Sequence, residues 1–419
     1  MAGEVALGGL AESARRLVGA SSEVASVFAT ATNAQRLAKR LSSMRGAAMK
    51  LGQLLSLEGD DILPSDVADA LAMLRADADA MPEAQLRRVL GHAFGKGWER
   101  RFREFGMEPI AAASIGQVHY GVTTDGREIA LKIQYPGVAK SIESDVDNLV
   151  AMLRLSRLLP GEIDLSGILA EAKRQLRQEA DYRAEAAHLR RYAAHLGDDP
   201  AFVVPRVHDD LTTSHILAMD YVAGEPLDEL SGSAQTLRDR VGGLLYRLFF
   251  REFFEFRFMQ TDPNFANYLL LPDSEQIGLL DLGAAHIIPP RLSRLYARIF
   301  QAALSGDRRA MRRVMQEIGF FDAEERADRV EGLIDLFLLA CEPFCHRGIY
   351  DFGTSDLAAR ARVVGMDLTF KKGFLRPPPP EVIFLHRKLG GMFLLCARLK
   401  ARVDARALLA PVLARALDD

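Results

Sequence analysis

The sequence has few cysteines, no long apolar run and little net charge, and each of these absences excludes a class of protein. Three cysteines in 419 residues argue against a disulfide framework and indicate a reduced, intracellular environment. No apolar run reaches the ~18–20 residues that a membrane-spanning helix needs, and we see no secretory signal pattern at the N-terminus. The net charge of −3 gives no argument for a nucleic-acid partner.

The sequence does contain enough apolar residues for folded lobes. Hydrophobic residues make up 49% of the chain, which indicates a globular protein with two or three lobes that have cores of their own. Cys341 and Cys345 lie four residues apart without a nearby histidine pair, which is a weak pattern for a zinc site. Together with Cys396, they are predicted to be buried, unreactive thiols.

The apolar periodicity changes twice along the chain and divides it into three predicted domains. Residues 1–105 have the three- and four-residue apolar spacing of helices and form a helical extension. Residues 106–222 are rich in Ile and Val and predict a small strand-rich lobe that also carries long helices. Residues 223–419 predict a helical lobe. The predicted fold class is therefore α+β, with two lobes of different composition.

The small lobe is expected to be built around a hairpin, because the turn Thr123–Gly126 separates two strand-like segments. The expected strands are 108–122, 127–134, 201–207 and 214–220, and the expected helices are 143–158 and 166–195. Residues 221–226 resemble a linker. In the helical lobe, the exception to helix is a strand pair, 268–271 and 277–280.

Lys132 is the first candidate for chemistry, because it ends the tetrapeptide Ile129–Lys132 on a predicted strand. Phosphoryl-transfer sites of the kinase type use a strand-borne lysine whose ammonium offsets phosphate charge. The tetrapeptide alone is a weak pattern, and by itself it favours a surface lysine on a hairpin. Its position among the other candidates decides between the two interpretations.

The segment before Lys132 occupies the position of a phosphate-covering glycine-rich loop, but alanines replace most of the glycines. Backbone amides can still face phosphates there, whereas side-chain methyl groups limit how closely the loop folds over them. A plain strand with a bend is the alternative. The candidate phosphate-contacting residues are Ala111, Ala112, Ala113, Ser114 and Gly116.

An acidic partner for Lys132 is expected on the helix predicted over 166–195. Glu179, Asp181 and Glu185 are the three carboxylates available there. Glu185 falls nearly two turns after Glu179, so a continuous helix would place both near one face. A solvated charged face is the alternative interpretation for each carboxylate.

The remaining chemistry lies in the helical lobe. Asp262 is followed five positions later by Asn267, the spacing of a kinase catalytic loop, although no His-Arg pair precedes it. Asp281 in Leu280–Gly283 would be the main magnesium ligand, with Asn267 as the second. No Ala-Pro-Glu follows, and residues 284–290 lead quickly into a predicted helix. This argues against a platform for a protein substrate.

Taken together, these residues closely resemble the UbiB/ADCK (ABC1-like) family of atypical kinases. Lys50–Gln53 fits the family's KxGQ signature, and Glu179–Asp181 fits its ExD motif. Gln134–Val138 fits the segment that follows the strand lysine of the family, here Lys132. The alanine-rich loop fits the family's replacement of the glycine loop. The sequence of Met259–Asn267 is similar to the corresponding segment in the mitochondrial, ubiquinone-associated branch of the family. The resemblance covers the chain from about residue 40 to residue 400.

The resemblance implies a protein-kinase-like two-lobed fold with an N-terminal helical extension, and a role for each matching residue. Lys132 would contact phosphates and pair with Glu185, Asp262 would be the catalytic aspartate, and Asn267 and Asp281 would bind Mg²⁺. Lys50 and Gln53 would meet Glu179 and Asp181 and gate the site. ATP or ADP would be held by the alanine-rich loop, Lys132, Met219, Tyr221 and Val222.

The implied function is that of an ATP-using accessory enzyme in ubiquinone biosynthesis, with little protein kinase activity in trans. The implied partners are a lipid-like quinone precursor, other quinone-biosynthesis proteins and a peripheral membrane surface, with a homodimer left open. The implied location is the cytoplasmic side of a bacterial membrane or, in a eukaryote, the mitochondrial matrix side. Two alternatives remain open, a small-molecule kinase of the aminoglycoside or choline type and a non-catalytic, nucleotide-gated chaperone for lipid precursors.

Overall fold

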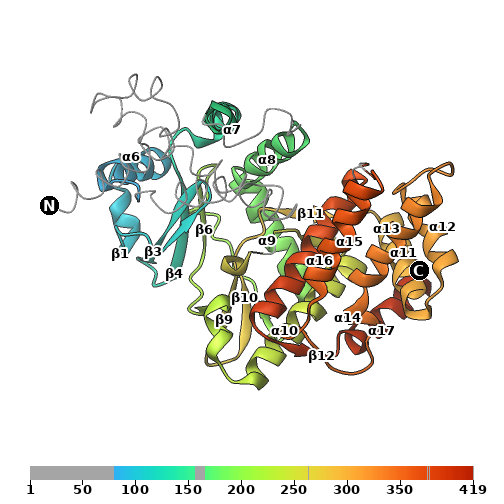
Figure 1. The fold of residues 1–419 in the computed structure, drawn as a ribbon. Coiled ribbons are helices and arrows are strands. Elements are labelled where there is room, and N and C mark those ends of the chain that lie inside the picture. Colours follow the sequence, from blue (N-terminus) through green and yellow to red (C-terminus); the bar gives the residue numbers. More distant parts are fainter. Residues whose placement is uncertain (1–79, 156–165, 263, 375, 377, 419) are drawn as a thin grey trace. The chain divides into compact units, whose positions relative to one another are not determined.

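A computed structural model describes residues 80–155, 166–262, 264–374, 376 and 378–418 (Figure 1). The chain divides into two compact units. Unit 1 comprises Met1–Ala187 and Arg206–Tyr221, and unit 2 comprises His188–Pro205 and Val222–Asp419. The mixed helical and sheet composition agrees with the predicted fold class.

Unit 1 is built on a five-stranded antiparallel sheet. Its order is β1-β3-β4-β6, with β2 paired to β3. The strands are β1 Phe102–Phe105, β2 Ala111–Ala113, β3 Gly116–Thr123, β4 Glu128–Gln134 and β6 Ile216–Asp220. Helix α6 Glu83–Phe94 and the short η1 Trp98–Arg101 complete this part. Leu86 and Leu90 of α6 join Ile129, Leu131 and Ile133 of β4 in one apolar core, because β4 lies between two strands and is buried almost throughout.

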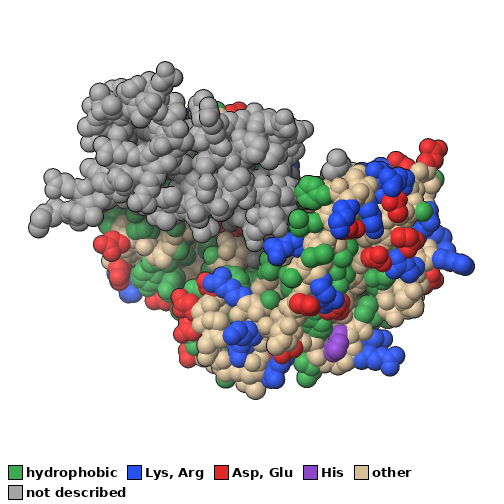
Figure 2. All heavy atoms as spheres, viewed as in Figure 1, with side chains coloured by type: hydrophobic (Ala, Val, Ile, Leu, Met, Phe, Trp, Pro, Cys, Tyr) green, Lys and Arg blue, Asp and Glu red, His purple; other side chains and the backbone are tan. Residues whose placement is uncertain are grey.

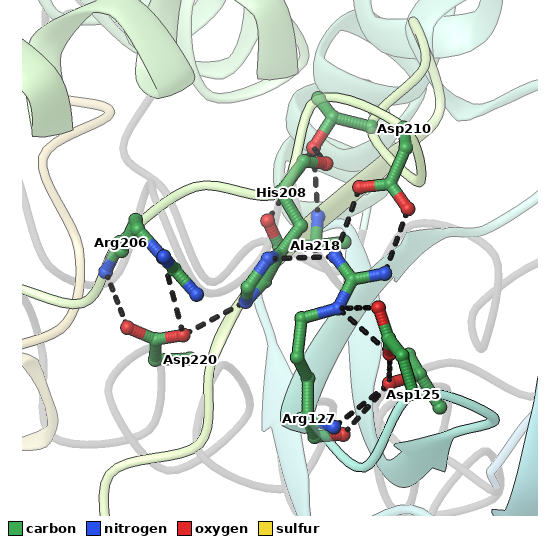
Figure 3. A network of polar contacts seen from close by, with 9 residues as sticks. Asp125, Arg127, Arg206, His208, Asp210, Ala218 and Asp220 are labelled. Carbon is green, nitrogen blue, oxygen red and sulfur yellow. Dashed lines mark hydrogen bonds and ion pairs between the residues drawn. The ribbon is translucent and has the colours of Figure 1, made fainter.

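The predicted hairpin turn at Thr123–Gly126 is confirmed, and Gly126 takes the positive φ of 88° that such a turn requires. A polar network ties this turn to the chain before β6 (Figure 3). The guanidinium of Arg127 donates two hydrogen bonds to the Asp210 carboxylate, at 3.0 and 2.9 Å. Hydrogen bonds from Arg127 and Thr123 lower the pKa of Asp125 to about 2. Because these groups lie near solvent, the network fixes the loop rather than supplying much stability.

Three helices follow β4, and here one prediction is wrong. They are α7 Val138–Leu155, α8 Ser166–Glu179 and α9 Tyr182–Leu196, of which α9 continues into unit 2. The single helix predicted over 166–195 is broken between α8 and α9. The carboxylate of Asp181 accepts a hydrogen bond from the Ala184 amide at 3.0 Å, so Asp181 caps the start of α9. A sequence pattern with continuous helical spacing does not show such a cap.

Unit 2 is mainly helical around an aromatic core. Phe249, Phe250 and Phe253 are fully buried where α10 passes into the π-helical segment η3. The helices are α10 Gln235–Phe250, η3 Arg251–Phe256, α11 Pro290–Ser305, α12 Arg308–Ile318, α13 Ala327–Ala340, α14 Glu342–Cys345, α15 Leu357–Met366, η5 Asp367–Lys371, α16 Pro380–Arg398 and α17 Ala405–Asp418. Two short 3₁₀ segments, η2 Leu227–Gly232 and η4 Phe265–Asn267, lie in the loops.

The strand content of unit 2 exceeds the prediction of one strand pair. The predicted pair is confirmed as β9 Tyr268–Leu271 and β10 Gln276–Leu279, in antiparallel register. It belongs to a four-stranded sheet with order β5-β10-β9-β7. Strand β5 Phe202–Val203 is the part of the strand expected over 201–207 that forms, and it pairs with β10 rather than with the sheet of unit 1. The strands that were not predicted are β7 Glu225–Pro226, β8 Phe258–Gln260, β11 Ala285–Ile287, β12 Tyr350–Asp351 and β13 Arg402–Val403. These five have only two or three residues each, too few for an alternating pattern to be recognised.

Candidate active site

The first group of predicted site residues lies in unit 1 and centres on a buried ion pair. The Lys132 ammonium donates to both carboxylate oxygens of Glu185, at 2.8 and 3.0 Å. The side chains of Lys132 and Glu185 are 8% and 0% exposed. The ammonium also lies 5.4 Å from the centre of the Tyr182 ring. Among the three carboxylates that the sequence offered, the structure therefore pairs Glu185 with Lys132.

Local structure explains how this pair forms. Lys132 lies in the middle of the sheet, opposite Val118 of β3 and Leu217 of β6, so its backbone is held on both sides. Glu185 lies in the first turn of α9, directly after the Asp181 cap. The expectation that Glu179 shares a helix face with Glu185 is wrong, because Glu179 is the last residue of α8.

The alanine-rich segment forms the β2–β3 hairpin. Ala111 and Ala112 are exposed, and Ala113 opposes Gly116 across a two-residue turn. Gly116 itself is buried against β4: a Cβ there would lie 2.2 Å from the Ile133 carbonyl oxygen. The glycine is thus required by the close approach of two strands, a structural role beside any contact with phosphate.

The other predicted nucleotide-contacting residues lie at the end of β6 and just after it. Met219 is buried and pairs with Ala130. Tyr221 is 38% exposed, and its amide donates to the Glu128 carbonyl at 3.0 Å. Met219 and Tyr221 belong to unit 1, whereas Val222 is the first residue of the second segment of unit 2.

The second group of predicted site residues lies in unit 2. Asn267 is buried, and its side-chain amide donates to the Asp262 carbonyl at 2.9 Å. The backbone carbonyl of Asn267 accepts from the Leu280 amide at 3.0 Å, directly before Asp281. One carboxylate oxygen of Asp281 accepts from the Gly283 amide at 2.9 Å. The structure therefore brings together Asp262, Asn267 and Asp281, which are separated along the sequence.

Two elements hold this group in place. The short strands β8 and β11 pair antiparallel, with Gln260 opposite Ala285. The hydroxyl of Thr261 donates to the Ala284 carbonyl at 2.7 Å. A ring nitrogen of His188 lies 2.9 Å from the Leu282 carbonyl. The segments that carry Asp262 and Asp281 are thus fixed to each other by backbone contacts.

Several residues that surround this group have no role that the sequence predicted. Glu252 and Lys388 form a buried pair, with Gln260 beside them. Gln260 stands two positions before Asp262, so its proximity to the predicted catalytic loop was a usable signal. Lys388, more than 120 residues away, has no spacing relation that could have indicated it.

The gating group is described only in part. Glu179 is 9% exposed at the end of α8, and Asp181 caps α9. Lys50 and Gln53 lie outside the described residues, so their contact with this pair of carboxylates stays a prediction. The rest of the predicted helical extension up to residue 79 also lies outside the described residues.

The three cysteines occupy positions typical of structural thiols. Cys341 and Cys396 are buried and Cys345 is half-buried, and all three are free thiols. Burial raises the pKa of Cys341 and of Cys396, so thiolates do not form there at neutral pH. Within the part of the chain that the structure describes, no group of three or more His, Cys, Asp and Glu residues could hold a metal ion.

The predicted magnesium site consists of a carboxylate and an amide, Asp281 and Asn267. Asp281 supplies a carboxylate and Asn267 an amide oxygen, both of the oxygen type that Mg²⁺ prefers. The side-chain nitrogen of Asn267 donates to the Asp262 carbonyl. The side-chain oxygen is the atom that could bind the metal. The donor chemistry fits Mg²⁺ carried in by nucleotide phosphates.

Comparison with known proteins gives a consistent result. The family description "ABC1 atypical kinase-like domain" matches residues 73–315. Atypical kinase COQ8B, mitochondrial, of Rattus norvegicus is 40% identical over 405 residues, covering 96% of this chain and 76% of that protein. Atypical kinase COQ8, mitochondrial, of Saccharomyces cerevisiae is 36% identical over 391 residues, covering 93% of this chain and 78% of that protein.

The fold also matches a solved structure. The structure described as the complex of Rv3197 with erythromycin from Mycobacterium tuberculosis aligns with a TM-score of 0.62 and 25% identity. The alignment covers 93% of this chain and 97% of the other. With the family match and the sequence relatives, this shows that the chain belongs to the ABC1 atypical kinase-like family, the family that includes the COQ8 proteins.

Proposed function

We propose that this atypical kinase binds a magnesium nucleotide and turns it over slowly as an accessory enzyme of ubiquinone synthesis. The observation that carries the proposal is the buried contact between the Lys132 ammonium and both oxygens of Glu185. Burying two charges costs several kcal/mol. A fixed ammonium at the centre of the sheet is suited to receive phosphate charge.

Each remaining residue has a role that follows from its chemistry. Asp262 can accept a proton from a hydroxyl or water nucleophile, or orient that nucleophile. Asn267 holds the backbone of the Asp262 loop through its amide nitrogen. When nucleotide is bound, Mg²⁺ held by Asn267 and Asp281 would neutralise charge on its phosphates. The exposed Ala111 and Ala112 would limit how closely the β2–β3 hairpin covers those phosphates.

The substrate class is proposed to be a lipid-like quinone precursor rather than a protein. Helix α11 begins at Pro290, shortly after Asp281, with only β11 between them, which leaves little chain for a peptide platform. Among the described residues on the face drawn, Figure 2 shows Lys and Arg interspersed with Asp and Glu, without a broad basic area that would suit nucleic acid.

The proposed place of action is a membrane surface, where other quinone-biosynthesis proteins would be its partners. The relatives named above are called mitochondrial, which supports the matrix side of that membrane for a eukaryotic source. No helix among the described residues is both long and apolar enough to cross a bilayer. Attachment is proposed to be peripheral, through the N-terminal extension.

Phosphate release from ATP, measured with and without liposomes that contain a short-chain quinone precursor, tests the proposal. Wild-type protein should show magnesium-dependent release that the liposomes increase, and Asp262→Asn should lose it. Asp273→Asn, an exposed carboxylate in the β9–β10 turn, is the matched control. Equal release by Asp262→Asn and wild type would overturn the assignment. Nucleotide binding without any release would favour the non-catalytic chaperone instead.

A further inference from the structure

A second buried ion pair lies in unit 2 and is not part of the predicted site. Glu252 of η3 and Lys388 of α16 are 0% and 1% exposed, and their charged atoms are 3.4 Å apart. The Glu252 carboxylate accepts from the Tyr192 hydroxyl at 2.5 Å and from the Gln260 amide at 3.0 Å. The Lys388 ammonium donates to the Tyr268 hydroxyl at 2.9 Å. Five separate elements thus meet at one buried polar cluster.

This cluster is connected directly to the two segments that carry the candidate catalytic groups. Gln260 lies two residues before Asp262, and its side-chain oxygen is 3.5 Å from the Lys388 ammonium. The amide nitrogen of the same side chain is 3.4 Å from the Asp281 carbonyl. Arg387, next to Lys388, donates to the Thr261 carbonyl at 3.0 Å. The pair is therefore linked through Gln260 to both segments, and Arg387 adds a contact to the segment that carries Asp262.

The local backbone is unusual at the same place. Glu252 stands in a π-helical turn, Arg251–Phe256, a rare form found preferentially at functional sites. The turn ends at Arg257, a non-glycine residue with a positive φ of 50°, which is an uncommon and strained conformation. Strand β8, with Gln260, begins at the next residue. The chain accepts this strain directly before the catalytic loop.

Stability alone does not explain the pair. Replacing a buried ion pair by apolar residues of similar size is often neutral or stabilising. Burial, the largest influence, lowers the pKa of Lys388, but Glu252 and Tyr268 raise it more, so the net direction is upward. The lysine is therefore charged at neutral pH. Glu252 and Tyr268 stabilise this buried charge.

We propose that Lys388 and Glu252 are positioning residues that hold Gln260, and through it the Asp262 and Asp281 segments, in the geometry used for turnover. Neither residue touches the reacting atoms in this account. The inference rests on the proposed roles of Asp262 and Asp281. It adds that a pair outside the sequence motifs sets the rate without contacting nucleotide.

The decisive variant is the double substitution Glu252→Gln with Lys388→Met in the full chain. Each single variant leaves one buried group uncompensated and should melt at a lower temperature than wild type. The double variant leaves no unpaired charge, so its melting temperature should be close to that of wild type and above that of either single variant. Its kcat for ATP should nevertheless stay at least tenfold below wild type, with KM for ATP changed less than threefold. Recovery of both melting temperature and kcat would show that the pair is only structural and overturn the proposal.

A second variant keeps the test informative if the double variant does not fold. Gln260→Met removes the link between the pair and Asp281 while leaving both charges paired, and it should lower kcat at least fivefold. A wild-type kcat in Gln260→Met would contradict the proposal. Glu255→Gln is the matched control, since this carboxylate lies on the same π-helical turn but pairs with Arg251 near the surface, at 3.1 Å. Asp262→Asn in the same assay tests the proposed function separately, because it removes the proposed catalytic carboxylate and leaves the Glu252–Lys388 pair intact.

Discussion

Among the described residues, each unit has a buried lysine–glutamate pair, and the two pairs differ in what surrounds the charges. In unit 1 the Lys132 ammonium contacts both oxygens of Glu185, and the lysine side chain is 8% exposed. In unit 2 the Glu252 carboxylate is shared with a tyrosine hydroxyl and a backbone amide, and the Lys388 side chain is 1% exposed. The first pair is suited to present charge to a ligand, whereas the second is suited to fix protein segments.

The comparison predicts the largest effect on folding at the second pair. Lys388→Met should lower the free energy of unfolding by about 3–5 kcal/mol, because it leaves the Glu252 carboxylate buried without its cation. Thermal and urea unfolding measure the loss. Lys371→Met, whose lysine side chain is 81% exposed and pairs with Asp367, should stay within about 0.5 kcal/mol of wild type. Equal stability of the two variants would show that Lys388 stabilises the fold no more than an exposed lysine does.

At the first pair, the larger effect should be on ligand binding. Lys132→Met should weaken nucleotide binding by about 10- to 100-fold, since a hydrogen bond to a charged group contributes about 1.5–3 kcal/mol. Calorimetric titration with ATP, below the melting temperature of the variant, measures this loss. Lys140→Met changes an exposed lysine of α7 in the same unit and should bind as wild type does. Unchanged affinity in Lys132→Met would show that this pair, too, is only part of the scaffold.

Gly116 tests whether the sheet that carries Lys132 depends on close strand packing. Gly116→Ala should destabilise unit 1 by about 1–3 kcal/mol, because the new methyl group would overlap the Ile133 carbonyl, a backbone atom. Gly91→Ala is the matched control: it lies in α6 with no atom within 4 Å of the added carbon, so stability should rise slightly. If Gly116→Ala melts no lower than Gly91→Ala, the strands are not as close as described.

The smallest expected effect concerns the helix that carries Glu185. Asp181→Ala should cost about 1 kcal/mol, the usual loss when an N-cap side chain is removed. Asp181→Ser keeps a capping oxygen and should recover most of the stability, and thermal unfolding compares the two. If instead the two variants change ATP turnover equally without a change in melting temperature, Asp181 acts in gating rather than as a cap.

The first pair could be predicted in large part from the sequence, and the second pair could not. The order and spacing of the kinase-type residues indicate a site that includes the first pair; these residues are Lys132, Asp262, Asn267 and Asp281. The break before α9 could not be predicted, because Asp181 interrupts the helix without changing the spacing of its apolar residues. The role of Lys388 could not be predicted either, because long-range packing brings it to Glu252 and the residue spacing within α16 does not indicate that contact.

The central claim is that Asp281 and its neighbours form a magnesium-nucleotide site, and one titration tests it most directly. ATP is titrated into wild type, Asp281→Asn and the exposed control Asp273→Asn, each in Mg²⁺ and in EDTA. Wild type and Asp273→Asn should bind at least tenfold more tightly in Mg²⁺, and Asp281→Asn should bind equally in both buffers. A wild-type gain from Mg²⁺ in Asp281→Asn would contradict the account.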